Sequence, residues 1–175
     1  MTDRYARQIA LPDVGPTGQA RLAAARVLVI GAGGLGCPVL HYLAAAGIGR
    51  LIVVDPDRVE ESNLHRQPLY TMTDIGARKV EAAHAALLRL NPTIAVEAWP
   101  QRLTPGNAAA LVATADIVVD AADSLATTYV LSDACMQQHT PLISASAVGL
   151  AGYVGGFCAG APSYRAVFPE MPARA

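Results

Sequence analysis

RVLVIGAGGLG, residues 26–36, is the stretch that decides the fold of this chain. An apolar run at 27–30 meets a cluster of glycines, and an apolar segment that favours a helix follows from Leu35 to Ala46. A short β-branched run bounded by glycines is typical of a buried strand. A strand that passes into a helix through glycines is typical of a phosphate-binding turn, because the free N–H groups and the positive end of the helix dipole face the anion.

Each of the four glycines has an expected role in such a turn. Gly31 makes the tight turn, Gly33 and Gly34 let the backbone approach a phosphate, and Gly36 lets the helix pack close to the strand. The motif indicates a nucleotide without saying which one. A tight strand–helix turn that holds no ligand is the alternative interpretation.

Composition restricts the class of protein. The chain has 175 residues, 53% of them hydrophobic and 15% charged, which favours one α/β domain whose sheet is covered on both faces. The net charge is -1 with no basic run, so we expect no binding to nucleic acid or to anionic membranes. No apolar stretch reaches membrane-spanning length and no signal peptide begins the chain, so we expect a cytoplasmic protein.

Strands and helices are expected to alternate along the chain. We expect helices at 3–9, 17–25, 35–46, 76–90, 105–113 (capped by Thr104) and 124–138, and strands at 26–30, 51–55, 94–99, 116–120, 142–145 and 152–157. This alternation predicts a doubly wound, Rossmann-like, mainly parallel sheet with helices on both faces. Residues 1–25 would form a helical arm on a single domain at 1–175, with a long polar loop at 56–75 and no clear element at 159–175.

Several polar residues should meet at one edge of this sheet, because ligands of such folds bind outside the carboxyl ends of the strands. The rule gathers the glycine turn, Asp55 and the segment 120–123. Asp55 lies 19 residues after Gly36, where a carboxylate can accept hydrogen bonds from both ribose hydroxyls of NAD or of ATP. An aspartate that merely caps a turn is the alternative.

Charged residues around this edge favour ATP. The loop after Asp55 carries Asn63, Arg66 and Gln67, the next helix begins near Lys79, and Asp123 follows the fourth strand. Two cations can neutralise a triphosphate while a separate carboxylate holds Mg²⁺, whereas hydride transfer needs no such set. Each of these residues taken alone is more often a solvated surface charge.

Seven motifs then carry a resemblance to a known family. They occur in this order: RYARQ (4–8), GAGGLG (31–36), DPD (55–57), SNLHRQ (62–67), IGARK (75–79), LNP (90–92) and DAADS (120–124). In this order and spacing they resemble the ThiF/MoeB/HesA family, the bacterial relatives of ubiquitin-activating enzymes. The resemblance runs from Arg4 to about Pro172.

The resemblance implies an ATP-dependent adenylyltransferase with a Rossmann-like adenylation domain. Members of the family use MgATP to convert the C-terminal glycine carboxylate of a small ubiquitin-like sulfur-carrier protein into an acyl-adenylate, and pyrophosphate leaves. Such carriers serve thiamine or molybdenum cofactor biosynthesis, and the sequence does not choose between them. The resemblance also implies a homodimer.

Roles for individual residues follow from the resemblance as well. Catalysis is expected from Arg7, Arg66, Lys79 and Asp123, where Asp123 binds Mg²⁺ and Arg7 reaches the neighbouring subunit's site as an arginine finger. A surface charge is the alternative for Arg7. Nucleotide binding is expected from Gly31, Gly33, Gly34, Gly36, Asp55 (ribose), Asp57, Asn63, Arg66, Lys79 (phosphates) and the supporting Gln67.

The chain also departs from the family pattern. Where the family usually has Pro-Cys-Tyr-Arg-Cys, half of a zinc site, this chain has PSYRA at 162–166, so we expect no zinc site. The sequence stops at Ala175, before the part of the family fold that lines the carrier's groove. We therefore expect weak or no carrier activation from these 175 residues.

Three alternatives stay open. An NAD-dependent oxidoreductase fits the first 55 residues but leaves Arg66 and Lys79 unexplained. A non-catalytic nucleotide-binding or dimerisation module fits the short chain and the lost cysteines. A family branch that activates a carboxylate on a tRNA base is disfavoured by the near-neutral charge.

Overall fold

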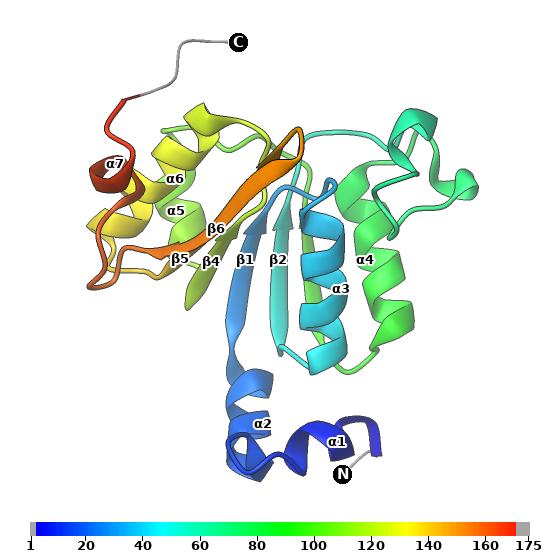
Figure 1. The fold of residues 1–175 in the computed structure, drawn as a ribbon. Coiled ribbons are helices and arrows are strands. Elements are labelled where there is room, and N and C mark those ends of the chain that lie inside the picture. Colours follow the sequence, from blue (N-terminus) through cyan, green and yellow to red (C-terminus); the bar gives the residue numbers. More distant parts are fainter. Residues whose placement is uncertain (1–2, 171–175) are drawn as a thin grey trace.

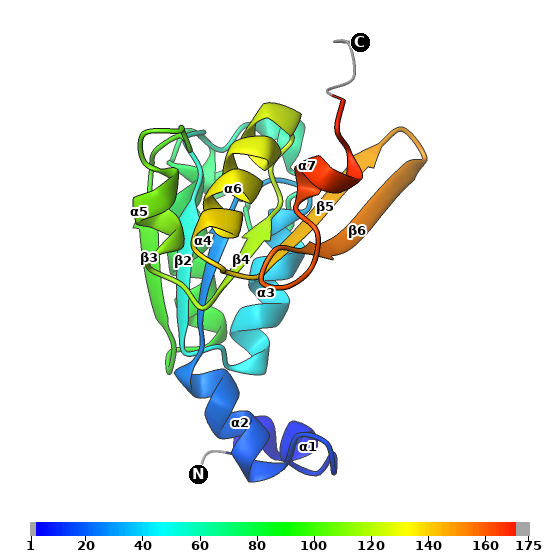
Figure 2. The same ribbon diagram turned by 90° about the vertical axis from the view of Figure 1, so that its left-hand side faces the viewer.

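The fold is a six-stranded sheet with helices on both faces, as a computed structural model of residues 3–170 shows (Figures 1 and 2). The strand order is β3-β2-β1-β4-β5-β6, and all neighbouring pairs are parallel except β5 and β6. The strands are β1 (Arg26–Ile30), β2 (Arg50–Val54), β3 (Ala95–Trp99), β4 (Ile117–Asp120), β5 (Leu142–Val148) and β6 (Ala151–Phe157). This confirms the Rossmann-like, mainly parallel α/β fold.

Seven α-helices accompany the sheet within residues 3–170. They are α1 (Ala6–Ile9), α2 (Gly15–Ala24), α3 (Gly36–Ala46), α4 (Lys79–Leu90), α5 (Ala108–Val112), α6 (Leu125–Gln137) and α7 (Tyr164–Val167). Short 3-10 turns at Asp3–Tyr5, Glu61–Asn63 and Met72–Asp74 complete the set. None of the helices in the described part of the chain is long and apolar enough to cross a membrane.

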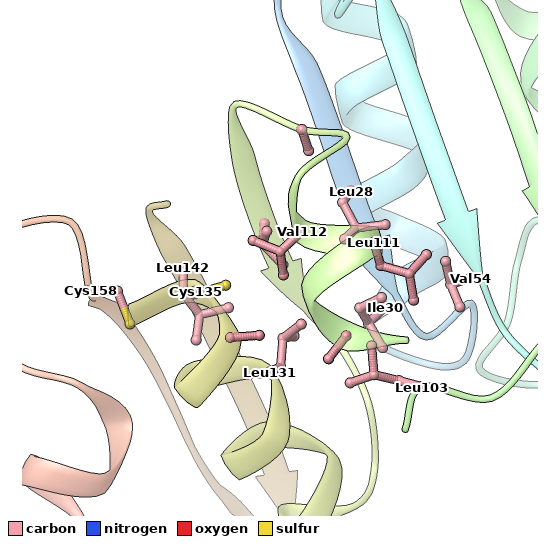
Figure 3. Close-up of a cluster of buried hydrophobic side chains, with 14 of the residues drawn as sticks. Leu28, Ile30, Val54, Leu103, Leu111, Val112, Leu131, Cys135, Leu142 and Cys158 are labelled. Carbon is pink, nitrogen blue, oxygen red and sulfur yellow. The ribbon is translucent and has the colours of Figure 1, made fainter. Parts of the chain in front are cut away.

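Alternate residues of the central strands serve two separate cores. Leu28 and Ile30 of β1 pack with residues of α5 and α6 on one face, as Figure 3 shows. Val27 and Val29 pack with residues of α3 and α4 on the other face. The apolar run at 27–30 is therefore buried on both sides, which explains why a continuous rather than an alternating apolar pattern marks this strand.

Strand β1 lies at the point where the strand order reverses. Ile30, the last residue of β1, is in register with Val54 of β2 on one side and with Asp120 of β4 on the other. The chain leaves all three strands at the same edge of the sheet, the upper edge in Figure 1. This geometry brings residues 31–36, 55–57 and 121–124 together.

The structure corrects four sequence-based boundaries. Helix α5 begins at Ala108 and not at 105, because a turn through Gly106 precedes it and the Asn107 side chain accepts a hydrogen bond from the Thr104 N–H (2.8 Å). Helix α4 begins at Lys79 and not at 76, because Gly76 has φ of +86° and Arg78 is extended. The fifth strand continues to Val148, where the expectation ended at 145.

The fourth correction concerns the tail at 159–175, where no element was expected. Helix α7 forms there because the Ser163 side chain accepts a hydrogen bond from the N–H of Ala166 (3.2 Å) and caps it. Residues 171–175 of that tail, and with them the end of the resemblance near Pro172, lie outside the described residues.

Strands β5 and β6 form a hairpin that reaches the same edge of the sheet (Figure 1). Among residues 3–170, β6 pairs only with β5. No charged residue occurs between 142 and 163, and Val148, Leu150 and Val154 are exposed. The outer edge of the sheet is therefore uncharged and apolar.

Candidate functional site

A cavity of about 810 Å³ opens at the carboxyl edge of the sheet, where β1, β2 and β4 end. This volume lies within the range of small-molecule sites. Most of the residues that the sequence singled out line it, namely Gly31, Gly33, Gly34, Asp55, Asp57, Asn63, Arg66, Gln67, Lys79 and Asp123. Gly36 and Arg7 are not part of the lining.

The four glycines of the turn fall into two kinds. A Cβ atom at Gly36 would lie 2.0 Å from the Gly31 carbonyl oxygen, and one at Gly31 would lie 2.6 Å from the Ala121 carbonyl oxygen. Gly31 also has φ of +96°. By contrast, a Cβ at Gly33 or Gly34 would come no closer than 3.6 Å to any neighbour. Gly31 and Gly36 are thus required by backbone packing, whereas Gly33 and Gly34 leave space open beside the cavity.

Asp55 organises the turn from the end of β2. Its Oδ2 accepts a hydrogen bond from the Ala32 N–H and its Oδ1 accepts one from the Asp57 N–H, both at 2.8 Å. The side chain is only 5% exposed, yet it borders the cavity. Because each carboxylate oxygen can accept a further hydrogen bond, Asp55 can both hold the glycine turn and bind a pair of hydroxyls.

Lys79 is the only lysine of the chain and it lies in the cavity wall. Its side chain is 8% exposed, and its Nζ lies 3.0 Å from Oδ2 of Asp57, whose own side chain is 55% exposed. The Lys79 N–H also donates to the Asp57 carbonyl oxygen (3.0 Å), which fixes the start of α4 against this segment. A buried ammonium with one solvated partner can bind an anion in the cavity.

The 60–67 segment covers the glycine turn with a second cation. The Arg66 guanidinium donates to the Asn63 side-chain oxygen (2.8 Å) and to the Ser62 carbonyl oxygen (3.3 Å). Arg66 is exposed, and its aliphatic part faces Gly34. Together with Lys79, Arg58 and Arg102 it makes four basic residues that line the cavity.

Gln67 supplies an unused acceptor at the same place. Its side chain is 2% exposed, and its Oε1 is buried without a hydrogen-bond partner within the described residues. An orphaned buried acceptor in a native structure calls for a ligand or a water. The open glycines and the basic side chains fit phosphate groups, whereas this acceptor can take a hydrogen bond only from a donor, such as a hydroxyl group of the ligand or a water.

The other wall of the cavity comes from the 121–124 loop and from the hairpin. Asp123 is exposed on this loop, and its side chain makes no hydrogen bond or ion pair with the described residues. An exposed carboxylate that borders the same cavity is the kind of oxygen ligand that Mg²⁺ takes along with phosphates.

Asp120 lies directly behind this loop and is fully buried. Its Oδ1 accepts a hydrogen bond from the Ala122 N–H (3.2 Å), and its Oδ2 accepts hydrogen bonds from the hydroxyls of Thr128 (2.7 Å) and Ser144 (2.9 Å). Burial raises the pKa of this carboxyl, and the three donated hydrogen bonds oppose that change. The sequence placed Asp120 at the end of a strand and at the ligand-binding edge but gave no sign of these partners.

Other lining residues were not anticipated from the sequence. Ser146, Ala147 and Val148 reach the cavity because β5 continues past the expected end and turns back as β6.

Tyr70 does not line the cavity but supports the glycine turn, since its buried hydroxyl donates to the Ala32 carbonyl oxygen (2.7 Å). Burial raises the pKa of the Tyr70 hydroxyl, which keeps it a neutral donor.

Arg7 lies on the arm at the opposite edge of the sheet from the cavity (Figure 1). Its neighbours in RYARQ attach the arm. The Arg4 guanidinium donates to the Leu90 carbonyl oxygen (3.0 Å), Asn91 donates to the Tyr5 hydroxyl (2.7 Å), and Gln8 donates to the Ala46 carbonyl oxygen (3.0 Å). Arg7 itself is exposed and makes no ion pair within residues 3–170. The fixed arm thus presents Arg7 outward and not to its own cavity.

The comparisons with known proteins agree with this arrangement. The model of the ThiF family matches residues 5–175. The chain belongs to the ThiF family. It is 49% identical to the sulfur carrier protein adenylyltransferase of Thermus thermophilus, 51% identical to the bovine adenylyltransferase and sulfurtransferase MOCS3 and 45% identical to the SAMP-activating enzyme E1 of Haloferax volcanii.

Each of these matches covers 97% of this chain but less of the relative. The chain spans 65% of the Thermus protein, 37% of bovine MOCS3 and 63% of the Haloferax enzyme. Two of these relatives are named as adenylyltransferases and the third as an activating enzyme.

Solved structures show the same ThiF fold. A structure of E. coli MccB with ATP matches with a TM-score of 0.81 at 30% identity. The match covers 90% of this chain and 48% of the MccB chain. The E. coli tRNA N6-threonylcarbamoyladenosine dehydratase TcdA, in complex with ATP, has a TM-score of 0.77 at 28% identity and covers 81% and 58%. Two structural relatives thus hold ATP on this fold.

The place where the family resemblance puts two zinc-binding cysteines is occupied by α7. Ser163 uses its hydroxyl to cap this helix, and Ala166 has no ligand atom. Cys37, Cys135 and Cys158 are buried free thiols. No group of three or more metal-binding side chains occurs within residues 3–170. The residues at this place do not fit a zinc ion, and the absence of zinc stays a prediction.

Proposed function

We propose that this ThiF domain binds MgATP and takes part in the adenylation of the C-terminal glycine carboxylate of a small ubiquitin-like sulfur-carrier protein. The observation that carries the proposal is that open glycines, basic side chains that include Arg66 and Lys79, and the exposed carboxylate of Asp123 line one cavity at the point of strand reversal. Further support comes from the names of relatives that are 45–51% identical over 97% of the chain, which describe adenylyltransferases and an activating enzyme.

The reaction assigns a task to each wall. A carrier carboxylate oxygen attacks the α-phosphorus of ATP, a P–O bond forms, and the bond to the leaving pyrophosphate breaks. Lys79 and Arg66 stabilise charge on the phosphates, and Asn63 contacts them. Asp57 orients Lys79 through their ion pair, and Gly33 and Gly34 let the backbone N–H groups approach. Asp55 binds the ribose hydroxyls, and Gln67 completes the site with its free acceptor.

Magnesium would be held by Asp123 on the opposite wall. When bound, the ion neutralises phosphate charge and supports departure of pyrophosphate. Gly31 and Gly36 act only through the shape of the turn, since both are required by backbone packing.

We further propose that the protein works in the cytoplasm as a homodimer in which Arg7 serves the neighbouring subunit's cavity. Arg7 lies at the far edge of its own sheet, and the attached arm holds it outward. A guanidinium that enters the second cavity would stabilise charge in the transition state.

Thermal shift separates the leading proposal from an NAD-binding function. We expect MgATP to raise the melting temperature of the 175-residue protein, and NAD at the same concentration to leave it unchanged. A rise with NAD and none with MgATP would overturn the proposal.

Carrier-dependent exchange of pyrophosphate into ATP tests the acceptor half of the proposal. A carrier without its terminal glycine is the matched control. We expect weak or no exchange from 175 residues. Exchange that is strong with the intact carrier and absent with the control would show that this length of chain suffices.

A further inference from the structure

We propose that Asp120 is a positioning residue that holds the magnesium carboxylate Asp123 in place. The inference rests on the proposed MgATP function. It concerns a residue that does not line the cavity. Ala121, Ala122 and Asp123 are among the lining residues, and Asp120 is not. Asp120 therefore acts through its neighbours and not through contact with the nucleotide.

Burial of the Asp120 carboxylate costs free energy unless donors compensate for the lost water. Asp120 has no exposed surface, and an ionised carboxylate in that position is unfavourable unless several donors satisfy it. Three donors do so, and each comes from a different segment. The Ala122 N–H belongs to the loop, the Thr128 hydroxyl to the first turns of α6, and the Ser144 hydroxyl to β5.

Two of these three hydrogen bonds fix the loop that carries Asp123. The bond from Ala122 fixes the chain immediately after β4, and the bond from Thr128 fixes the helix on the other side of Asp123. One carboxylate thus holds both ends of the short segment between β4 and α6. Asp123 is exposed on that segment without a hydrogen-bond partner among the described residues, so its position depends on the loop alone.

A row of hydroxyl groups connects Asp120 to strand β6 and helix α7. The Ser144 hydroxyl lies 3.0 Å from the Tyr153 hydroxyl of β6, which lies 3.2 Å from the Tyr164 hydroxyl of α7. Tyr164 is 3% exposed and packs against four aromatic rings, those of Tyr129, Tyr153, Phe157 and Phe168. The hydroxyl groups of Tyr153 and Tyr164 hold Ser144 in place. The hydrogen bonds that fix the loop itself are made directly to Asp120.

The test is a double-mutant cycle between Asp120→Asn and Asp123→Asn, with ATP affinity measured by calorimetry with Mg²⁺ and with EDTA. Asparagine keeps the volume of Asp120 and removes its charge. We expect Asp120→Asn to reduce the gain in affinity from Mg²⁺ about fivefold and to leave the affinity measured in EDTA within twofold of wild type. In the Asp123→Asn background, Asp120→Asn should have no further effect on that gain.

Thr128 provides matched variants. Thr128→Ser keeps the donor to Asp120 and should retain the gain from Mg²⁺, whereas Thr128→Val keeps the shape, removes the donor and should reduce it. Tyr153→Phe removes the hydroxyl next to Ser144 but keeps all three donors to Asp120, so it should leave the gain from Mg²⁺ unchanged. Far-UV circular dichroism and melting temperature verify that each variant is folded.

Two results would overturn the inference. Equal loss of affinity with Mg²⁺ and with EDTA would mean that Asp120 serves the fold in general, and additive effects in the cycle would mean that it does not act through Asp123. Failure of the wild-type protein to bind MgATP would instead overturn the proposed function, and this inference with it.

Discussion

The two walls of the cavity hold their functional groups in different ways. On the β1–β2 wall, the glycine turn and Asp55 are part of the backbone packing, and the buried Lys79 is paired with Asp57. On the β4–β5 wall, Asp123 is exposed on a loop that is fixed from behind. Changes to the tightly packed glycines of the first wall should therefore disturb folding, whereas changes to the exposed Asp123 of the second wall should affect binding alone.

The largest effect is expected at Gly36. Gly36→Ala would place a methyl group 2.0 Å from the Gly31 carbonyl oxygen, so the turn or α3 must move. We expect the free energy of unfolding to fall by about 3 kcal/mol or more, measured by urea denaturation. Gly33→Ala is the matched control, because its methyl group would lie 3.7 Å from the nearest neighbour. It should keep its stability and lose ATP affinity, and equal destabilisation of the two variants would break the division of the glycines into two kinds.

Lys79→Met should have the next largest effect, and it should appear in binding. A charged hydrogen bond to phosphate contributes about 1.5–3 kcal/mol, so we expect MgATP affinity to fall about 10- to 100-fold in calorimetry. Asp57 is left without its partner but stays solvated, so the melting temperature should change little. Arg89→Met, on the exposed far end of the same helix, is the control and should bind as wild type does. An unchanged affinity in Lys79→Met would remove the lysine from the site.

Asp123→Asn tests the second wall by itself. Because the side chain is exposed and has no bond to the described residues, we expect no change in melting temperature. Affinity for MgATP should fall about tenfold, while affinity for ATP in EDTA should not change. A loss of stability in this variant would show that the loop depends on Asp123 and would contradict the contrast between the walls.

The smallest effect is expected at the amino edge of the sheet, away from both walls. Hydrogen bonds from Arg26 hold the pKa of the Asp116 carboxyl below its ordinary value of 3.8. Because the folded-state pKa is the lower one, the stabilisation is present above pH 3.8 and is lost as the pH falls through the folded-state pKa. Both side chains are nearly half exposed, so screening keeps the effect small.

Asp116→Asn should accordingly lower the melting temperature slightly at pH 7 and not at acid pH, with MgATP affinity unchanged. High salt should diminish the difference between the variant and the wild type. A change in nucleotide affinity would mean that the amino edge communicates with the cavity.

The sequence predicts the β1–β2 wall well, whereas on the β4–β5 wall it predicts Asp123 but not the contacts behind it. The strand at 26–30, its glycines and Asp55 form one local unit, so spacing along the chain is enough to place them. Ser144 and Thr128 meet Asp120 only through the pairing of β4 with β5 and the return of α6, and a hydroxyl in an apolar strand gives no sign of that contact.

The same reason explains the errors elsewhere. The chain reverses its direction between β5 and β6 at Gly149, which has φ of +60°, so the two strands are antiparallel. An apolar run by itself does not show whether the next strand is parallel or antiparallel. Helix α7 depends on one serine cap and on aromatic contacts with residues far along the chain. Such long-range contacts are outside the reach of local pattern.

The uncharged edge strand β6 has a practical consequence for anyone who purifies this chain. Natural sheets protect their outer strands with lysines, prolines or bulges, because unpaired backbone groups join readily to strands of other molecules. The stretch from 142 to 163 contains no charge, and Val154 faces solvent. Concentrated solutions should accordingly scatter light more as they age, and the hairpin is the first place at which to add a lysine for solubility.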